Sequence, residues 1–349
     1  MKQISELRRD IVSGDWVVIA TGRAKRPHDF LEQKKIPFRQ SKKTCPFEVL
    51  EKDALLCYSL NSGSSPRQSG LPQRKGGTKN EQWWIEAVPN KFPAFTKGIC
   101  AVFNHVGPYE WTEGAGAHEV VVTRDHKRPL ALMTDKEAEL VIRAYQERYH
   151  VLSQDDCVQY ISIFHNHGRS AGASIAHPHS QIIAIPVVPP DIARSLAGSK
   201  RYFHAHKKCV HCVIIAHEAK ERARIIYQNE HFVALAPYAS RSAFEIRIFP
   251  KTHSAHVERM KDDERILFAH TLRISLAKLY HGLNNPDYNF FIHTAPKKDG
   301  TRWAHYHWHL EIVPKTAVWA GFEIGTGIEI SAISPESAAE FLREIKVEK

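Results

Sequence analysis

The sequence predicts an α+β protein made of two similar units, each an antiparallel sheet with packed helices. Strand-like runs rich in β-branched or alternating apolar residues recur along the chain, and helical segments interrupt them. The pattern of cysteine and histidine residues in the first half recurs in the same order in the second half. At 349 residues the chain is long enough for two cores of about 170 residues each, which is near the usual domain size.

The expected strands are short and are separated by turns or helices. They lie at Trp16–Ala20, His118–Thr123, Val158–Phe164, Gln181–Val187, Phe232–Leu235, Phe244–Phe249, Asn289–His293 and His305–Val313. Among the helices, Thr134 and Glu137 make a capping box before a helix over Ala138–Val151. Apolar residues at helical spacing predict a second helix over Asp262–His281, and Ser334–Pro335 begins a third.

The repeated landmarks are a Cys-x-x pair, a histidine after a strand, and closely spaced histidines on a later strand. In the first half they are Cys45, Glu48, His126, His177 and His179, and in the second half they are Cys209, Cys212, His253, His305, His307 and His309. The separation between corresponding histidines is 51 residues in the first half and 54 in the second. We therefore expect a duplication, with one unit over 1–198 and the other over 199–349.

The composition excludes several classes of protein. The net charge of +10 comes from lysines and arginines spread along the whole chain, so an anionic small substrate explains it as well as a nucleic acid does. No window approaches the roughly 18 apolar residues of a membrane span, so we expect a cytoplasmic protein with no membrane partner. The six cysteines are too sparse for a small secreted disulfide scaffold.

The segment from Phe164 to Gln181 contains the residues best suited to catalysis. In an extended strand His177 and His179 lie on the same face, and Pro178 fixes the backbone between them. Gln181 adds a neutral hydrogen-bond donor on that face. The strand therefore predicts a site that binds phosphate oxygens without a lysine.

A loop upstream of this strand fits the same chemistry. Gly168, Gly172 and Ser174 lie where exposed backbone N–H groups could hold a phosphate. A neutral imidazole is itself a nucleophile near pH 7, so no serine–aspartate relay is required. An isolated histidine is usually an ordinary core or surface residue. A His-Pro-His-x-Gln sequence behind a Gly/Ser loop is more specific, and we predict that His179 is the nucleophile with Gln181 as its catalytic partner.

The sequence His177-Pro-His179-Ser-Gln181, with Asn166 and Ser174 upstream, is similar to the active-site strand of the galactose-1-phosphate uridylyltransferase family, a branch of the histidine-triad superfamily. The resemblance extends across nearly the whole chain. It implies two fused histidine-triad-like units, a homodimer, and a reaction that passes through a nucleotidylyl-histidine on His179.

Three further segments carry the resemblance. RAKRP at 23–27 matches a family stretch whose arginines reach the nucleotide phosphates across the dimer interface. VPNKFPA at 88–94 resembles the loop that holds the base and ribose, and GFE at 321–323 resembles the hexose-binding segment. The substrate-binding residues that the resemblance implies are Arg23, Arg26, Asn90, Phe92, Asn166, Gly172, Ser174, Phe322 and Glu323.

The resemblance also implies a metal cage in the first half, with Cys45, His126 and His177 as ligands. Thiolate and imidazole ligands suit a tetrahedral zinc ion. Here CPFE replaces the expected CPFC, so the fourth ligand must be Glu48, a water, or another group such as Cys57.

The second half offers a complete ligand set of two cysteines and two histidines. These residues are Cys209, Cys212, His253 and His307. We expect zinc as the cofactor, with two ions per chain and iron possible in one site. Both cages are expected to hold the fold, and the first also to anchor the nucleophile strand.

The function implied by the resemblance is a nucleotidylyl transferase. It would exchange a nucleoside monophosphate between a nucleotide-sugar and a sugar 1-phosphate, and UDP-glucose with galactose 1-phosphate is the expected pair. Two departures bear on the substrate. Lys91 stands where well-known family members carry an aspartate, and it cannot accept a hydrogen bond from a ribose hydroxyl. Ala317 replaces a lysine near the hexose phosphate.

Three alternatives remain open at this point. One is an ADP-sugar phosphorylase that uses phosphate as acceptor, and another is a hydrolase. The third is a zinc-stabilised nucleotide- or RNA-binding module, which a strongly salt-dependent affinity for nucleic acid would favour. Such a module leaves the catalytic strand and the 321–323 segment unexplained, so no nucleic-acid partner is expected. The sequence does not identify the sugar, the base, the acceptor or the metal.

Overall fold

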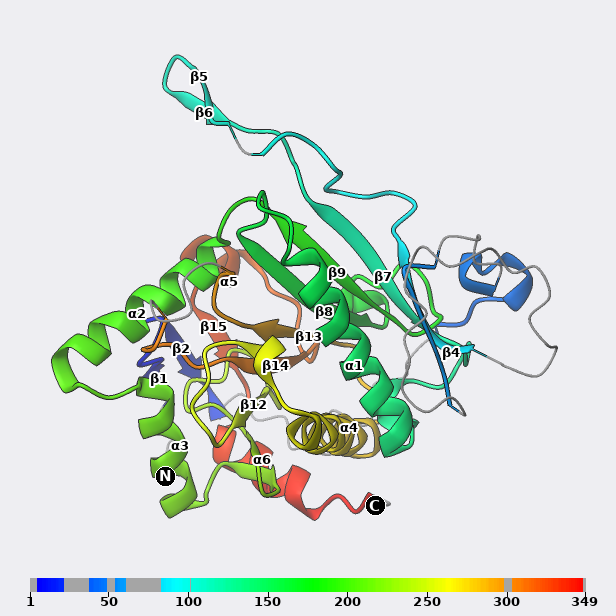
Figure 1. The fold of residues 1–349 in the computed structure, drawn as a ribbon. Coiled ribbons are helices and arrows are strands. Elements are labelled where there is room, and N and C mark those ends of the chain that lie inside the picture. The colour runs from blue at the N-terminus through cyan, green and yellow to red at the C-terminus, as the bar shows by residue number, and fades with distance from the viewer. Residues whose placement is uncertain are drawn as a thin grey trace.

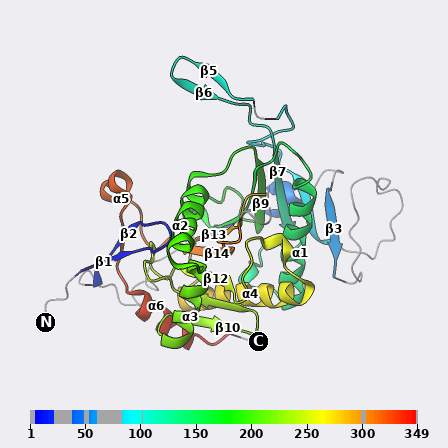
Figure 2. The ribbon, with the colours of Figure 1, turned by 60° about the vertical axis from the view of Figure 1, so that its left-hand side comes forward.

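The computed structural model describes residues 5–21, 38–48, 54–60, 83–100, 102–297 and 303–347. Within these ranges ten strands form one large antiparallel sheet, with helices packed around it (Figures 1 and 2). No helix in the described part of the chain is long and apolar enough to cross a membrane.

The large sheet consists of two halves with the same strand order. In spatial order the first half contains β3 (Leu56–Ser59), β4 (Trp83–Pro89), β7 (Ala117–Thr123), β9 (His179–Ile185) and β8 (Tyr160–His167). The second half contains β10 (Ile225–Gln228), β11 (Phe232–Leu235), β12 (Ile246–Pro250), β14 (His309–Pro314) and β13 (Tyr288–His293). Counted along the chain, the fifth strand of each half (β9 or β14) pairs with the third (β7 or β12). The fourth strands, β8 and β13, pair with each other where the two halves meet.

A long helix connects the third and fourth strands of each half. These helices are α1 (Asp135–Leu152) and α4 (Asp262–Gly282). The repeated strand order and helix position confirm the predicted α+β class with two similar antiparallel units. The capping box predicted at Thr134 and Glu137 begins α1, and Ser334 caps the C-terminal helix as expected.

Two elements cross between the expected units. α2 (Pro190–His206) continues across residues 198 and 199. β2 (Trp16–Ile19) pairs with β1 (Glu6–Arg9) and with β15 (Glu329–Ser331), so the N-terminal strands lie against the second unit. The division into 1–198 and 199–349 stays a proposal, supported by the repeated strand order.

The remaining elements surround the sheet. They are α3 (Val210–Glu221), α5 (Gly321–Thr326), α6 (Pro335–Glu344), and short 3-10 helices at Lys42–Thr44, Pro46–Glu48, Leu130–Leu132, Arg169–Ala171 and Val257–Arg259. The hairpin of β5 (Asn104–Val106) and β6 (Tyr109–Trp111) projects from the body as an arm (Figure 1).

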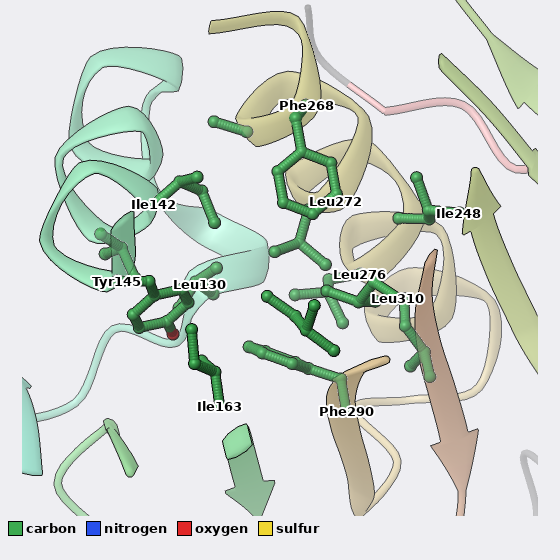
Figure 3. Packing of buried hydrophobic residues seen from close by; sticks show 14 of the residues in the cluster. Leu130, Ile142, Tyr145, Ile163, Ile248, Phe268, Leu272, Leu276, Phe290 and Leu310 are labelled. Atoms are coloured by element: carbon green, nitrogen blue, oxygen red, sulfur yellow. The ribbon is translucent and has the colours of Figure 1, made fainter. Parts of the chain in front are cut away.

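The main core lies between one face of the sheet and the helices α1 and α4, which pack against each other (Figure 3). Leu272 of α4 and Phe290 of β13 are both fully buried there. Burying such a side chain contributes roughly 1.5–3 kcal/mol. Because side chains alternate along a strand, Ile182 and Ala184 of β9 enter this core while His179 lies on the other face. That other face carries the candidate site.

One predicted strand is shorter than expected. β14 begins at His309 rather than at His305, because residues 303–306 form a turn closed by a backbone hydrogen bond from Tyr306 to Trp303. Likewise, His177 and Pro178 precede β9 and do not lie within it.

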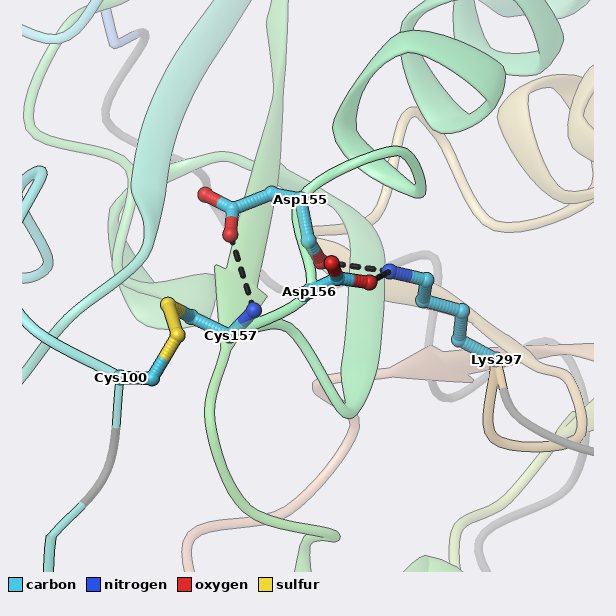
Figure 4. Close-up of a disulfide and its surroundings, with 5 residues drawn as sticks. All are labelled: Cys100, Asp155, Asp156, Cys157 and Lys297. Carbon is cyan, nitrogen blue, oxygen red and sulfur yellow. Dashed lines mark hydrogen bonds and ion pairs between the residues drawn. A yellow bond between two sulfur atoms is a disulfide. The ribbon is translucent and has the colours of Figure 1, made fainter.

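A disulfide joins Cys100, at the base of the arm, to Cys157 in the turn between α1 and β8 (Figure 4). The backbone N–H of Cys157 donates to the Asp155 carboxylate at 2.9 Å. Lys297 in turn donates to the Asp155 carbonyl oxygen at 2.5 Å. The sequence analysis did not pair these cysteines, because they lie 57 residues apart in elements whose contact depends on the sheet.

Candidate active site and metal centres

His179 begins β9 and is only 8% exposed. Its Nδ1 atom lies 2.8 Å from the carbonyl oxygen of His177. Because a carbonyl oxygen only accepts, Nδ1 carries the proton and Nε2 keeps its lone pair. Burial lowers the pKa of His179, and the hydrogen bond to the His177 backbone offsets part of this effect. The side chain is therefore a neutral imidazole whose Nε2 can act as a nucleophile.

A buried hydrogen-bond network lies on the core side of β9, beneath the nucleophile. The Ser180 hydroxyl is 2.5 Å from the hydroxyl of Tyr145 on α1 and 3.0 Å from Nδ1 of His165 on β8. All three side chains are at most 2% exposed. The network connects the beginning of β9 to its neighbouring strand and to α1. The sequence analysis missed it because its members are far apart along the chain.

Gln181 lies two residues along β9 from His179 and contacts His118 of β7. Oε1 of Gln181 is 2.7 Å from Nε2 of His118. Nδ1 of His118 accepts a hydrogen bond from the backbone N–H of Ala94 at 3.2 Å, and Nδ2 of Asn90 lies 3.0 Å from Nε2 of His118. His118, which the sequence analysis did not select, thus joins the catalytic strand to the 88–94 loop.

Two predicted substrate-binding residues lie on that loop, directly after β4. The backbone N–H of Phe92 donates to Oδ1 of Asn90 at 2.9 Å. The Phe92 ring is 82% exposed. The hydrogen bond from Ala94 to His118 fixes this end of the loop to the site, while the Phe92 ring is open to a ligand.

Asn166 lies on β8, and the strand register places it next to His179 across the β8–β9 pair. Nδ2 of Asn289 donates to Oδ1 of Asn166 at 2.8 Å and to the Ala171 carbonyl oxygen at 2.7 Å. Asn289 belongs to β13, so the second half of the sheet contributes to the site of the first. Its role requires the pairing of the two halves and could not be read from the chain order.

The loop between β8 and β9 depends on two glycines with positive φ, Gly168 at 82° and Gly172 at 85°. A Cβ atom at Gly168 would lie 2.1 Å from the Asp287 carboxylate, which accepts the Ser170 backbone N–H at 2.8 Å. Gly172 and Ser174 are exposed just before the catalytic strand. Their placement agrees with the predicted phosphate-holding role.

The first predicted cage is assembled from three separate elements. The ligand atoms of Cys45, His126 and His177 all lie within 4.8 Å of one another. Nε2 of His126 donates to the carbonyl oxygen of Gln40 at 2.8 Å, and Nε2 of His177 donates to that of Thr123 at 2.6 Å. Both rings therefore turn an unprotonated Nδ1 toward the cage, as metal-ligating histidines do.

Glu48, the predicted fourth ligand, lies beside this cage. Its Oε1 atom lies 2.9 Å from Nδ1 of His126 and 3.7 Å from Nδ1 of His177. Burial raises the pKa of the Cys45 thiol, backbone N–H groups lower it, and the Glu48 carboxylate raises it. A divalent cation would stabilise both the thiolate and the carboxylate, so the donor set fits zinc. Cys57 instead contacts Glu86 on β4 and is not a member of this cage.

The second cage has the same design. Its ligand atoms, again within 4.8 Å of one another, belong to Cys209, Cys212, His253 and His307. Sγ of Cys212 is 3.4 Å from Nδ1 of His253 and 3.5 Å from Nδ1 of His307, while Nε2 of each ring donates to a backbone carbonyl. The hydrogen bond from Cys212, with help from the histidines, lowers the pKa of Cys209 despite its burial. A thiolate is thus favoured where a metal would need one.

The second half also contains a counterpart of the His179 strand, at the closely spaced histidines that the sequence pattern indicated. A third compact group of possible ligands is formed by His293, His309 and Glu311. His309 stands in the place of His179, but Glu311 replaces the neutral Gln181. Arg241 and Arg247 hold the Glu311 carboxylate at 2.6 and 3.0 Å. A fixed carboxylate opposes a phosphate group, so among the described residues the His179 strand suits phosphoryl chemistry better than its counterpart does.

Two predicted segments remain: one lies outside the described residues and the other lies away from the first cage. Arg23 and Arg26 lie outside the described residues. Phe322 and Glu323 lie on α5, on the opposite side of the molecule from the 3-10 helices at 42–48 (Figures 1 and 2). Phe322 is 48% exposed, and the Glu323 carboxylate accepts the N–H of Ala320 at 3.0 Å.

The fold and the site define a class of protein: a duplicated α+β chain with two groups of Cys and His side chains that could hold a metal, and a buried histidine whose Nδ1 carries the proton. A family model described as "Galactose-1-phosphate uridyl transferase, N-terminal domain" matches residues 1–189. A second model, for a domain of unknown function (DUF4921), matches residues 108–346. The chain belongs to the galactose-1-phosphate uridylyltransferase family, which confirms the predicted resemblance.

Several relatives align over nearly the full length. An ADP-glucose phosphorylase of Arabidopsis thaliana is 34% identical, covering 99% of this chain and 94% of the relative. A galactose-1-phosphate uridylyltransferase of Thermotoga maritima is 30% identical, covering 98% and 99%. Among solved structures, the Arabidopsis thaliana ADP-glucose phosphorylase with bound ADP-glucose is similar with a TM-score of 0.76, at 32% identity and covering 99% of this chain and all of that one.

Proposed function

We propose that this protein is a nucleotidylyl transferase that uses His179 as its nucleophile. The observation that carries the proposal is the 2.8 Å hydrogen bond from Nδ1 of His179 to the His177 carbonyl, which leaves the Nε2 lone pair for attack. Nε2 forms a bond to the α-phosphorus of a nucleotide-sugar, and the bond from that phosphorus to the bridging oxygen breaks to release a sugar 1-phosphate. An acceptor phosphate oxygen then attacks the same phosphorus, the N–P bond breaks, and His179 is regenerated.

The residues around His179 would neutralise charge on the reacting phosphate. Asn166 and Gln181 flank the nucleophile on one face of the sheet, and Ser174 is exposed on the adjacent loop. Hydrogen-bond donors that are already oriented stabilise a phosphoryl transition state strongly, because they need not reorganise during the reaction. Arg23 and Arg26, outside the described residues, are proposed to reach the phosphates as the family resemblance implies.

The two cages are proposed to hold zinc, with iron possible in one of them. Cys45, Glu48, His126 and His177 would hold one ion, and Cys209, Cys212, His253 and His307 the other. When bound, each ion supplies a rigid cross-link between distant segments. The first cage acts on catalysis only through His177, whose carbonyl oxygen sets the tautomer of His179.

The substrate is proposed to be ADP-glucose with phosphate as the acceptor. The full-length similarity to the Arabidopsis thaliana ADP-glucose phosphorylase supports this pair. Lys91 and Ala317 also support it, because both replace residues expected for uridylyl transfer between sugars. The pair expected from the sequence analysis, UDP-glucose and galactose 1-phosphate, is the second candidate, supported by the family model and the Thermotoga maritima relative.

The proposal includes a homodimer and a cytoplasmic location. A second copy is needed because α5, with Phe322 and Glu323, lies far from the cage of its own chain (Figure 1). Val318, Trp319 and Ile324 around α5 are exposed apolar residues that a partner would cover. The free thiols of the two cages suit a reducing compartment, whereas the Cys100–Cys157 disulfide would be unusual there.

The test is to incubate the protein separately with ADP-glucose and UDP-glucose and to measure the intact mass after denaturation. An added AMP on His179 would support the first pair, and an added UMP would support the second. Phosphate should discharge the AMP adduct faster than galactose 1-phosphate does. Absence of any adduct, with the sugar phosphates also unreleased, would contradict the proposed function.

A further inference from the structure

We infer that His118 and Asn289 are positioning residues that turn the amide N–H groups of Gln181 and Asn166 toward the phosphoryl group at His179. This inference rests on the proposed function and adds two residues to it. Neither side chain needs to touch the substrate. Each holds the oxygen end of an amide whose nitrogen end faces the site.

The five side chains share one face across four neighbouring strands. Asn289 and Asn166 are directly paired in the β13–β8 register. The β7–β9 register places His118 diagonal to Gln181 on the same face. One of the two amides, Gln181, therefore lies on the same strand as His179, and the other, Asn166, lies on β8.

A backbone N–H group determines which partner donates the hydrogen bond between His118 and Gln181. The N–H of Ala94 can only donate, so Nδ1 of His118 is the acceptor and a neutral ring carries its proton on Nε2. That proton is donated to Oε1 of Gln181 at 2.7 Å. Nδ2 of Asn90 does not compete for it, because the Phe92 N–H occupies the oxygen of that amide and its NH2 group is also a donor.

The polarity of the Asn289 contact is fixed in the same way. The Ala171 carbonyl can only accept, so the Asn289 atom beside it is the NH2 group. Its second hydrogen is donated to Oδ1 of Asn166 at 2.8 Å. The NH2 groups of Gln181 and Asn166 therefore point away from His118 and Asn289. An unheld amide can rotate and present its oxygen, which would repel a phosphate oxygen.

The test uses the variants His118→Phe and Asn289→Leu, which keep the size of the side chain and remove the held contact. The readout is the single-turnover rate of nucleotidylyl-His179 formation at saturating ADP-glucose or UDP-glucose, whichever labels the wild-type protein. Each variant should lower this rate about tenfold or more, with KM changed by less than about threefold. His150→Phe and Asn104→Leu, at exposed positions, serve as matched controls and should keep the wild-type rate.

Double variants separate positioning from a general structural effect. His118→Phe should add less than about twofold to the loss caused by Gln181→Ala, because its effect passes through that amide. Asn289→Leu should behave likewise in an Asn166→Ala background. His118→Phe combined with Asn166→Ala should instead multiply the two losses. His118→Gln retains a donor for Gln181 and should recover most of the rate. His118→Leu, which also removes the donor, replaces His118→Phe if that variant does not fold.

Rate losses that multiply when His118→Phe is combined with Gln181→Ala, and when Asn289→Leu is combined with Asn166→Ala, would overturn the inference while leaving the proposed function intact. Wild-type rates in both single variants would overturn it as well. Failure of the proposed function has a different signature. In that case the wild-type protein itself gives no adduct with either nucleotide-sugar, and the inference falls with it.

Discussion

The Glu48 carboxylate and the His126 imidazole face each other in the first cage, with Oε1 2.9 Å from Nδ1. The glutamate therefore occupies the place where the family pattern would have a cysteine. The contact places the residue that departs from the family pattern beside the three grouped side chains Cys45, His126 and His177. It also gives a direct test.

We expect two zinc-like ions per chain and one in the Glu48→Ala variant, because that cage would keep only three protein ligands. Glu48→Cys should restore the second ion. Elemental analysis of purified protein measures the ratio, and Glu344→Ala, at an exposed position, is the control. A ratio of two in Glu48→Ala would exclude the carboxylate as a necessary ligand.

We expect His179→Asn to lower kcat by more than about 10³-fold, because the nucleophile is removed and its hydrogen bond to the His177 carbonyl is largely preserved. The melting temperature should change little. Steady-state rates and a thermal melt on the same samples check both statements. Turnover at the wild-type rate would end the assignment of the nucleophile.

We expect thiol titration in denaturant with a chelator to find four free thiols before reduction and six after it, because Cys100 and Cys157 form a disulfide. Cys100→Ser should lower the free energy of unfolding by about 2–4 kcal/mol through loss of the cross-link. Cys57→Ser, which removes a thiol outside the disulfide, is the control. Six titratable thiols without a reductant would contradict the pairing.

A pH dependence should follow from Asp10, whose carboxylate accepts from the buried Arg247 guanidinium at 3.0 Å. Burial raises the pKa of Asp10, but Arg247 and two backbone N–H groups together hold it below its ordinary value of 3.8. A depressed pKa contributes stability that is present above 3.8 and is lost as the pH falls through the folded-state value.

The Asp10→Asn variant should therefore be less stable than wild type by about 1–3 kcal/mol near pH 7, and this difference should shrink as the pH is lowered from about 5 toward 3. Urea unfolding at several pH values measures it. Asp156→Asn, at an exposed position, provides the matched control. A difference that stays constant with pH would mean that the charge of Asp10 does not stabilise the fold.

The sequence by itself determined the local chemistry and the class of fold. Runs of β-branched or alternating apolar residues predicted β7, β11 and β13, because such a pattern is a local property of the sequence. The capping box at Thr134 is equally local. The His177–Gln181 segment indicated the nucleophile, and the resemblance supplied the cage ligands of the first half.

Only the tertiary structure decided which distant residues support that chemistry. Strand register, not spacing along the chain, sets His118 beside Gln181 and Asn289 beside Asn166. The same holds for Glu48, whose neighbours His126 and His177 come from the ends of other strands. A hydrogen bond fixes a tautomer or an amide orientation only when both partners are in place, so folding alone determines how this site presents its donors.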